Sequence, residues 1–168
     1  MAAAAFARLA PEHPDLRLIV AGDGPERTAL ATLTPEVRDR VTMLGSIPNV
    51  DLPPYHAASD LYVGSAVGGE SFGMVLVEAM ASGLPVVASR IPGYTEVVRD
   101  GVDGILVAPR DPGALAVALA RVLDEPGLAE RLIAAGRERA RTFDWSTVVA
   151  RLEVLYLHAA TGGPASLP

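Results

Sequence analysis

The sequence predicts an α/β fold in which helices cover both faces of a parallel sheet, followed by a helical C-terminal segment. Half of the 168 residues are apolar, short apolar runs alternate with helical patterns, and glycine-rich turns follow several runs. Apolar runs of about 4–6 residues are typical of strands that are buried on both faces. The predicted strands are 16–21, 41–44, 60–63, 85–88 and 104–107, and the predicted helices lie near 25–33, 51–59, 72–82 and 94–99.

The chain beyond Pro109 is predicted to be helical. Asp111-Pro112 begins one helix, Pro126 begins the next, and Asp144 is the N-cap of a third, which Phe143 and Val148 flank at the spacing of a hydrophobic staple. Residues 1–160 are therefore expected to form one domain, and the Gly-, Pro- and Ser-rich residues 161–168 a flexible tail. The core face of the first of these helices is predicted to carry Leu115, Ala118, Leu119 and Val122.

Composition excludes several kinds of function. The chain has no Cys, so it has no disulfides or thiolate metal ligands, and all 14 of its basic residues are Arg. Without Lys there is no Schiff-base or P-loop chemistry. A net charge of −6 argues against nucleic acid as a partner, because nucleic-acid binders present a basic face. Arg137, Arg139 and Arg141 alternate around Glu138, which indicates a solvated helix face.

No segment reads as a membrane anchor or leader. Residues 1–7 lack the basic start of a signal peptide, and the longest apolar region, 72–88, is interrupted by Glu78 and by Gly83-Leu84-Pro85. A soluble, cytoplasmic protein is expected.

Residues 68–83 form the most informative stretch. They read as a glycine-rich loop, Ser71 as N-cap, and a helix that stops at Gly83. The helix is apolar on every side except at Glu78, which predicts that it is buried and that this carboxylate needs partners. The alternative is a purely structural helix, with Glu78 bonded to the backbone or to an Arg and Glu70 exposed.

The start of this helix is predicted to bind an anion. Its first turn, 72–75, contains no Asp or Glu to complement the positive end of the helix dipole. In parallel sheets, ligands bind beyond the carboxyl ends of the strands, where this loop lies. Free backbone N–H groups at this place suit a phosphate group.

The stretch also carries a family resemblance. Gly-Gly-Glu-Ser-Phe-Gly-x-x-x-x-Glu-Ala-Met-Ala-x-Gly-x-Pro-Val-Val-Ala resembles the Glu-x7-Glu signature of retaining GT-B glycosyltransferases, with Glu70 and Glu78 as its two carboxylates. The similarity runs from about Leu16 to Tyr156, and it implies a Rossmann-like, nucleotide-sugar-binding domain that is one half of a GT-B fold. Further features that match are Gly22-Asp23-Gly24-Pro25, Leu44-Gly45-Ser46-Ile47, Ala58-Ser59-Asp60 and 101–107.

The resemblance also implies a subfamily and a donor. Gly-Gly-Glu-Ser-Phe-Gly and the segment Phe143-Asp144-Trp145-Ser146 look most like phosphatidylinositol mannosyltransferases, which suggests GDP-mannose. In such enzymes Glu70 would be catalytic and contact the sugar, Glu78 the ribose, and 45–47 the base. The implied donor-binding residues are Glu70, Ser71, Phe72, Gly73, Met74, Val75, Glu78, Gly45, Ser46, Ile47 and Gly22.

The resemblance implies no metal and no cofactor, and His13, His56 and His158 are expected at the surface. Retaining members are thought to form no covalent intermediate, because the departing phosphate helps to deprotonate the acceptor.

The chain departs from the family pattern in two respects. It lacks the loop whose Arg-Lys pair reaches the diphosphate, and it lacks the N-terminal acceptor domain. We therefore expect the isolated chain to be inactive and to need that domain or a partner chain, through which it would associate peripherally with the inner membrane face. Trp145 and the last helix are expected to expose apolar surface.

Three alternatives remain open. Gly69–Gly73 matches the Gly-x-Ser-x-Gly elbow of serine hydrolases, with Ser71, Asp100 or Asp111, and His158 in the required chain order. However, 64–69 separate this elbow from the preceding strand. Gly22-x-Gly24 hints weakly at a dinucleotide fold. The chain is alternatively a non-catalytic nucleotide-sugar-binding fragment, or a subunit of a split transferase.

Overall fold

The computed structural model describes residues 1–161. Residues 162–168 of the predicted tail lie outside the described part, and Thr161 is the last residue of a helix. Five strands lie within two residues of their predicted bounds. They are β1 (Leu18–Ala21), β2 (Val41–Gly45), β3 (Tyr62–Gly64), β4 (Val86–Ser89) and β5 (Ile105–Val107).

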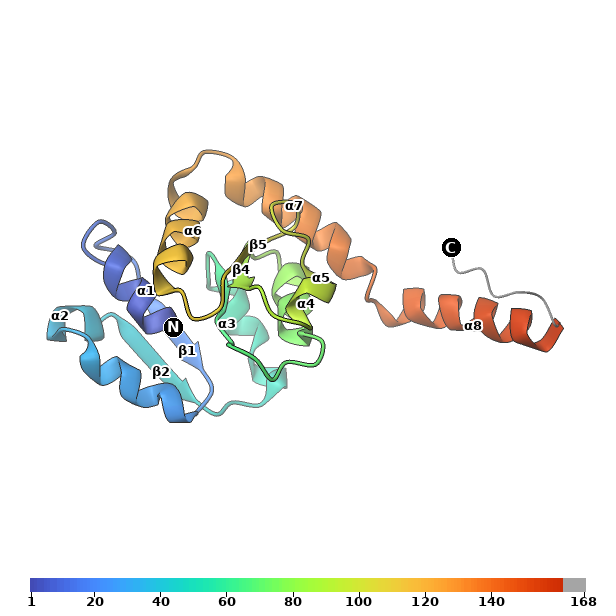
Figure 1. The fold of residues 1–168 in the computed structure, drawn as a ribbon, viewed down its shortest axis with the longest axis horizontal. Coiled ribbons are helices and arrows are strands. Elements are labelled where there is room, and N and C mark those ends of the chain that lie inside the picture. The colour runs from blue at the N-terminus through green and yellow to red at the C-terminus, as the bar shows by residue number, and fades with distance from the viewer. Residues whose placement is uncertain (162–168) are drawn as a thin grey trace.

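All strand pairs are parallel, as predicted, but they form two sheets instead of one. β1 pairs with β2, and β3, β4 and β5 pair in that order. Among the described residues no strand ladder joins β1 to β3, and the segment between β2 and β3 connects the first sheet to the second (Figure 1).

The helices on the first half of the chain are shorter than predicted. Pro53 and Pro54 form the first turn of the 51–59 helix, where proline is accommodated, and the predicted ranges 72–82 and 94–99 contain no proline. The 25–33 helix is a 3₁₀ helix. The elements are η1 (Pro25–Thr32), α2 (Pro35–Arg38), η2 (Asn49–Asp51), α3 (Pro53–Ala57), α4 (Met74–Ala81) and α5 (Tyr94–Val97).

An N-terminal helix was not predicted. Helix α1 (Ala2–Leu9) buries Ala5, Phe6 and Leu9, and it packs on α6 (Pro112–Asp124). Alanine is the strongest helix former, and Ala5, Phe6 and Leu9 recur at helical spacing, so the sequence carries a signal for this helix.

The core lies on both faces of β4, which is buried along its whole length. Val86 and Ala88 face a cluster with α4 and α5, whereas Val87 faces a cluster with α1 and α6. This alternation confirms that helices cover both faces of the larger sheet.

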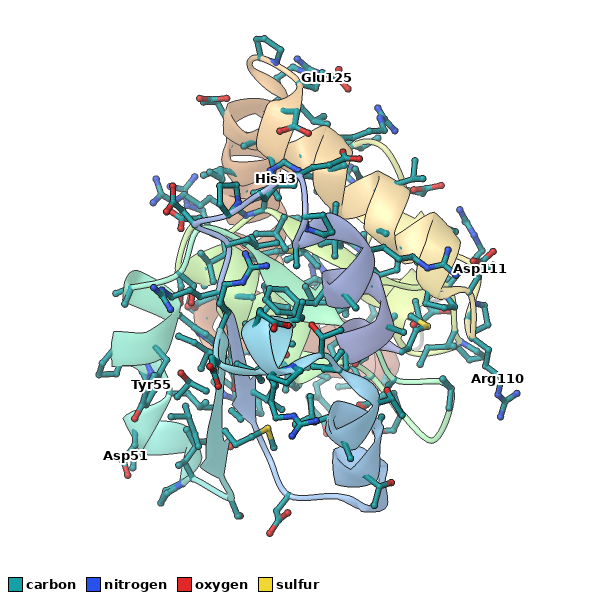
Figure 2. The ribbon with its side chains drawn as sticks, turned by 90° about the vertical axis from the view of Figure 1, so that its left-hand side faces the viewer. His13, Asp51, Tyr55, Arg110, Asp111 and Glu125 are labelled. Atoms are coloured by element: carbon teal, nitrogen blue, oxygen red, sulfur yellow. The ribbon has the colours of Figure 1, made fainter. Side chains whose placement is uncertain are left out.

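Helix α6 confirms its prediction closely. Asp111 caps it, because its carboxylate accepts from Gly113 N and Ala114 N, both at 2.9 Å. Figure 2 shows α6 running from Asp111 at its start to Glu125 beyond its end, on the outside of the molecule. All four predicted core residues, Leu115, Ala118, Leu119 and Val122, are buried.

The last two helices differ in their packing. Helix α7 (Leu128–Arg141) begins after Gly127 instead of at Pro126, whereas α8 (Trp145–Thr161) extends away from the other elements (Figure 1). As predicted, Asp144 accepts from Ser146 N at 2.8 Å and Trp145 is exposed, by 79%. None of the helices within residues 1–161 is long and apolar enough to cross a membrane.

One buried carboxylate fixes the turn before β5. Asp103 is completely buried and accepts from the backbone N (2.7 Å) and Nε (2.5 Å) of Arg99. We expect Asp103→Ala to lower the free energy of unfolding by about 1–3 kcal/mol, since a buried N–H loses its acceptor. Urea unfolding measures this, and a loss below about 0.5 kcal/mol, as at ordinary surface sites, would show that the turn does not depend on Asp103.

Candidate functional site

The loop between β3 and α4 is shaped by glycine. Gly69 and Gly73 have φ angles of +82° and +86°, which other residues rarely adopt. Gly73 is the N-cap of α4, and the helix begins at Met74 without a side-chain cap. The prediction that Ser71 caps the helix is therefore wrong, because the left-handed turn at Gly73 leaves Ser71 and Phe72 in the loop.

The first turn of α4 leaves backbone donors open. It contains no acidic side chain, as predicted. Within residues 1–161 the backbone amides of Phe72, Gly73 and Met74 have no backbone acceptor. Helices leave such N–H groups at their start, where the dipole favours an anion. The amides at this end of α4 can therefore donate hydrogen bonds to phosphate oxygens.

The two carboxylates of the Glu-x7-Glu pair lie close to this helix start. Glu70 is exposed and Glu78 is half-buried, so α4 is less completely buried than predicted; Met74 is 51% exposed. Among the described residues, neither Glu side chain makes a hydrogen bond or an ion pair; Glu78 contributes only its carbonyl, which accepts from Ser82. Among the described residues, Glu78 thus lacks the partner that the purely structural alternative gives it, whereas Glu70 is exposed as that alternative expects.

The charges of the two carboxylates contribute to the raised pKa values of two nearby tyrosines. Burial, then the charge of Glu78, then that of Glu70 raise the pKa of Tyr62 to about 12. Burial, then Glu70, then Tyr62 raise the pKa of Tyr94. The charges of both carboxylates therefore act on the Tyr62 hydroxyl. That the two belong to one donor site stays a prediction.

The start of α5 packs against the loop between β3 and α4. A Cβ at Gly73 would lie 2.7 Å from Cδ1 of Tyr94, and a Cβ at Gly93 would lie 2.8 Å from the carbonyl oxygen of Glu70. The two segments touch only because both positions are glycine. Sequence reasoning missed Gly93 and Tyr94; a Gly-aromatic pair at the carboxyl end of β4 was the available signal.

The predicted base-binding residues Gly45, Ser46 and Ile47 lie at the end of β2, and the predicted donor-binding residue Gly22 follows β1. Gly22 N donates to Gly45 O at 2.7 Å, and both glycines have positive φ. Ser46 is exposed and Ile47 half-buried. No hydrogen bond between described residues joins them to 68–73, although in Figure 1 both segments lie toward the lower side of the view. Their role stays a prediction.

The histidines are not all at the surface. His56 is buried, with Nδ1 3.4 Å from Oγ of Ser82 and its ring edge-on to Tyr62, which corrects the prediction. His13 and His158 are half-buried, and Nε2 of His13 lies 3.5 Å from the carboxylate of Asp124. The reason is tertiary packing that the local sequence does not show. Among the described side chains, which are those of residues 1–160 apart from 25–27, no group of three His, Asp or Glu could hold a metal ion.

The structure does not place the residues of the serine-hydrolase alternative in a catalytic arrangement. Ser71 lies beyond the loop glycines, not at the tip of β3, and His158 is on α8, which extends away from the rest (Figure 1). Asp100 accepts from Leu106 N and pairs with Arg90, and Asp111 caps α6. The structure does not bring the three groups together.

Comparisons with known proteins identify the family. Residues 1–139 match the family model of glycosyl transferases group 1. A phosphatidyl-myo-inositol mannosyltransferase of Mycobacterium leprae is 40% identical over 149 residues, which are 89% of this chain and 40% of that protein.

Solved structures show the same fold. A sucrose-phosphate synthase of Thermosynechococcus elongatus superposes with a TM-score of 0.75 at 31% identity, covering 96% of this chain and 43% of that one. HepE of Anabaena, in complex with UDP-glucose, gives 0.74 at 26% identity, covering 95% and 44%. The chain thus spans about two fifths of these proteins. It belongs to the group 1 glycosyl transferases, and its fold is the Rossmann-like half of a GT-B glycosyltransferase.

Proposed function

We propose that this chain is the donor-binding half of a retaining glycosyltransferase and binds a nucleoside-diphosphate sugar at the start of α4. The observation that carries this proposal is the combination of an open helix N-terminus with two carboxylates that have no hydrogen-bonding partner among the described residues. A sugar nucleotide has the complementary groups, since it carries hydroxyls at both ends of an anionic diphosphate.

Each group has a defined task. The Glu78 carboxylate accepts two hydrogen bonds from the ribose diol, the amides of Phe72, Gly73 and Met74 bind the diphosphate, and Glu70 accepts from sugar hydroxyls. During transfer the bond from the anomeric carbon to the phosphate oxygen breaks, and the acceptor oxygen bonds to the same face. The acceptor proton goes to the departing phosphate. Stabilising that leaving charge is the main contribution of this half.

GDP-mannose is the donor that we favour. The support is the Gly-Gly-Glu-Ser-Phe-Gly sequence and the mannosyltransferase of Mycobacterium leprae at 40% identity. The UDP-glucose complex of HepE makes UDP-sugars the alternative. Neither donor needs a metal or cofactor from this chain in the proposed mechanism.

A thermal-shift screen tests the proposal. GDP, UDP and ADP, each alone and as sugar conjugates, are added to the purified chain. A selective ligand at a hundredfold excess over its Kd should add about 2.7 kcal/mol of stability by mass action. If no nucleotide or nucleotide sugar raises the Tm, the donor-binding proposal is wrong.

Glu70 should distinguish the sugar from the nucleotide. We expect Glu70→Ala to weaken binding of the nucleotide sugar by about 1.5–3 kcal/mol for each lost hydrogen bond to the carboxylate, and to affect the bare nucleotide little. Calorimetric titrations with both ligands measure the difference. Equal losses for the two ligands would mean that Glu70 only shapes the loop.

A further inference from the structure

Arg139 on α7 is not the solvated side chain that its alternating charge pattern predicts. It is half-buried, whereas Arg137 and Arg141 on the same helix are exposed. Its Nε donates to Val97 O at 2.8 Å and its Nη2 to Glu96 O at 2.7 Å. These carbonyls end α5 and have no helical partners, so the planar guanidinium joins α7 to α5 through two charge-assisted bonds.

The same guanidinium holds an aromatic contact with the loop. Its Cζ lies 4.7 Å from the centre of the Phe143 ring. Phe143 then meets Phe72 edge to face, with ring centres 5.5 Å apart and an interplanar angle of 83°. Because Phe72 belongs to the loop before α4, this contact braces the loop from the side of α7.

A second contact runs through α5. This helix begins at Tyr94, whose ring touches Gly73, and the preceding Gly93 lies against the backbone of Glu70. Arg139 holds the other end of α5. The loop thus contacts two aromatic rings, Tyr94 and Phe143. Arg139 is hydrogen-bonded to α5, which carries Tyr94, and its guanidinium contacts the Phe143 ring directly.

We propose that Arg139 is a positioning residue for the donor site. It touches neither the Glu side chains nor the open amides; it fixes α5 and the Phe143 ring, which set the position of the loop backbone and hence of Glu70 and the Phe72–Met74 amides. The consequence for ligand binding rests on the proposed function, but the effect on the loop does not.

Hydrogen exchange of the ligand-free chain tests the effect on the loop. Arg139→Gln is compared with Arg141→Gln, a matched change of an exposed residue on the same helix. We expect two bonded amides to exchange about tenfold faster in Arg139→Gln alone: that of Leu76, which donates to Gly73 O, and that of Val98, which donates to Tyr94 O. Amides of β4 serve as the internal reference. Unchanged exchange of Leu76 and Val98, or equal acceleration there and in β4, would overturn the proposal.

Binding supplies the second readout. Phe143→Leu removes the ring contact while keeping an apolar side chain, so the proposal can be tested even if Arg139→Gln unfolds. Both variants should weaken binding of GDP-mannose or UDP-glucose, whichever the wild type binds, about tenfold, and their effects should not add. Additive effects, or affinities equal to that of Arg141→Gln, would contradict the coupling. A wild-type chain that binds neither ligand refutes the proposed function but leaves the exchange result valid.

Discussion

Glu78→Ala should abolish most of the stabilisation that a nucleoside diphosphate gives to this chain. The carboxylate is half-buried, and among the described residues it has no hydrogen-bonding partner. In our proposal it accepts hydrogen bonds from the hydroxyls of a bound ribose. Loss of two hydrogen bonds to a charged group should cost about 1.5–3 kcal/mol each. The measurement is the ligand-induced shift in Tm, followed by calorimetry.

The control is Glu138→Ala, which removes a carboxylate from an exposed surface ion pair with Arg141. Such pairs contribute about 0–1 kcal/mol, so folding and nucleotide affinity should change little. Equal nucleotide affinity for the wild type and Glu78→Ala would remove the ribose role of this residue.

The isolated chain should transfer no sugar, even where it binds donor. Transfer requires an acceptor hydroxyl held next to the anomeric carbon, and this positioning supplies much of the rate enhancement. The chain spans about two fifths of its relatives, and in our proposal the acceptor surface belongs to the remaining part. An open donor site also leaves water to screen the phosphate contacts.

The assay compares the purified chain alone with the chain plus a candidate N-terminal partner, using nucleotide sugars with lipid and small-molecule acceptors. We expect turnover only with the partner, whether that partner is a domain or a separate subunit. Acceptor-dependent turnover by the chain alone, at about 1 per second or more, would show that the site is complete without it.

The sequence predicts the elements of this fold better than their assembly. The strands are short apolar runs, of which only β4 and β5 are buried along their whole length, and Asp111 is a local cap, so both follow from neighbouring residues. The division into two sheets depends on which strand edges meet, and no local pattern encodes that. The start of α4 was misplaced because Ser71 and Gly73 are both plausible caps, and only the contact of Gly73 with Tyr94 decides between them.

In the site, too, the sequence predicts local features better than contacts between distant residues. Glu70 and Glu78 were found because they share one loop and helix, at a spacing that carries a recognisable motif. His56 and Arg139 were misjudged because their partners are distant in sequence, at separations of 26 residues for Ser82 and 43 for Glu96. Tertiary packing buries His56 and half-buries Arg139, where the local pattern predicts solvent.

Amide chemical-shift mapping during titration with GDP-mannose, and with UDP-glucose in parallel, tests the central claim most directly. The 17.5 kDa chain is small enough for residue-level assignment. We predict that the largest changes fall on the amides of Phe72, Gly73 and Met74, with a second group at Gly45, Ser46 and Ile47. Shifts that saturate elsewhere while the amides at the start of α4 stay unchanged would contradict the donor site that we propose.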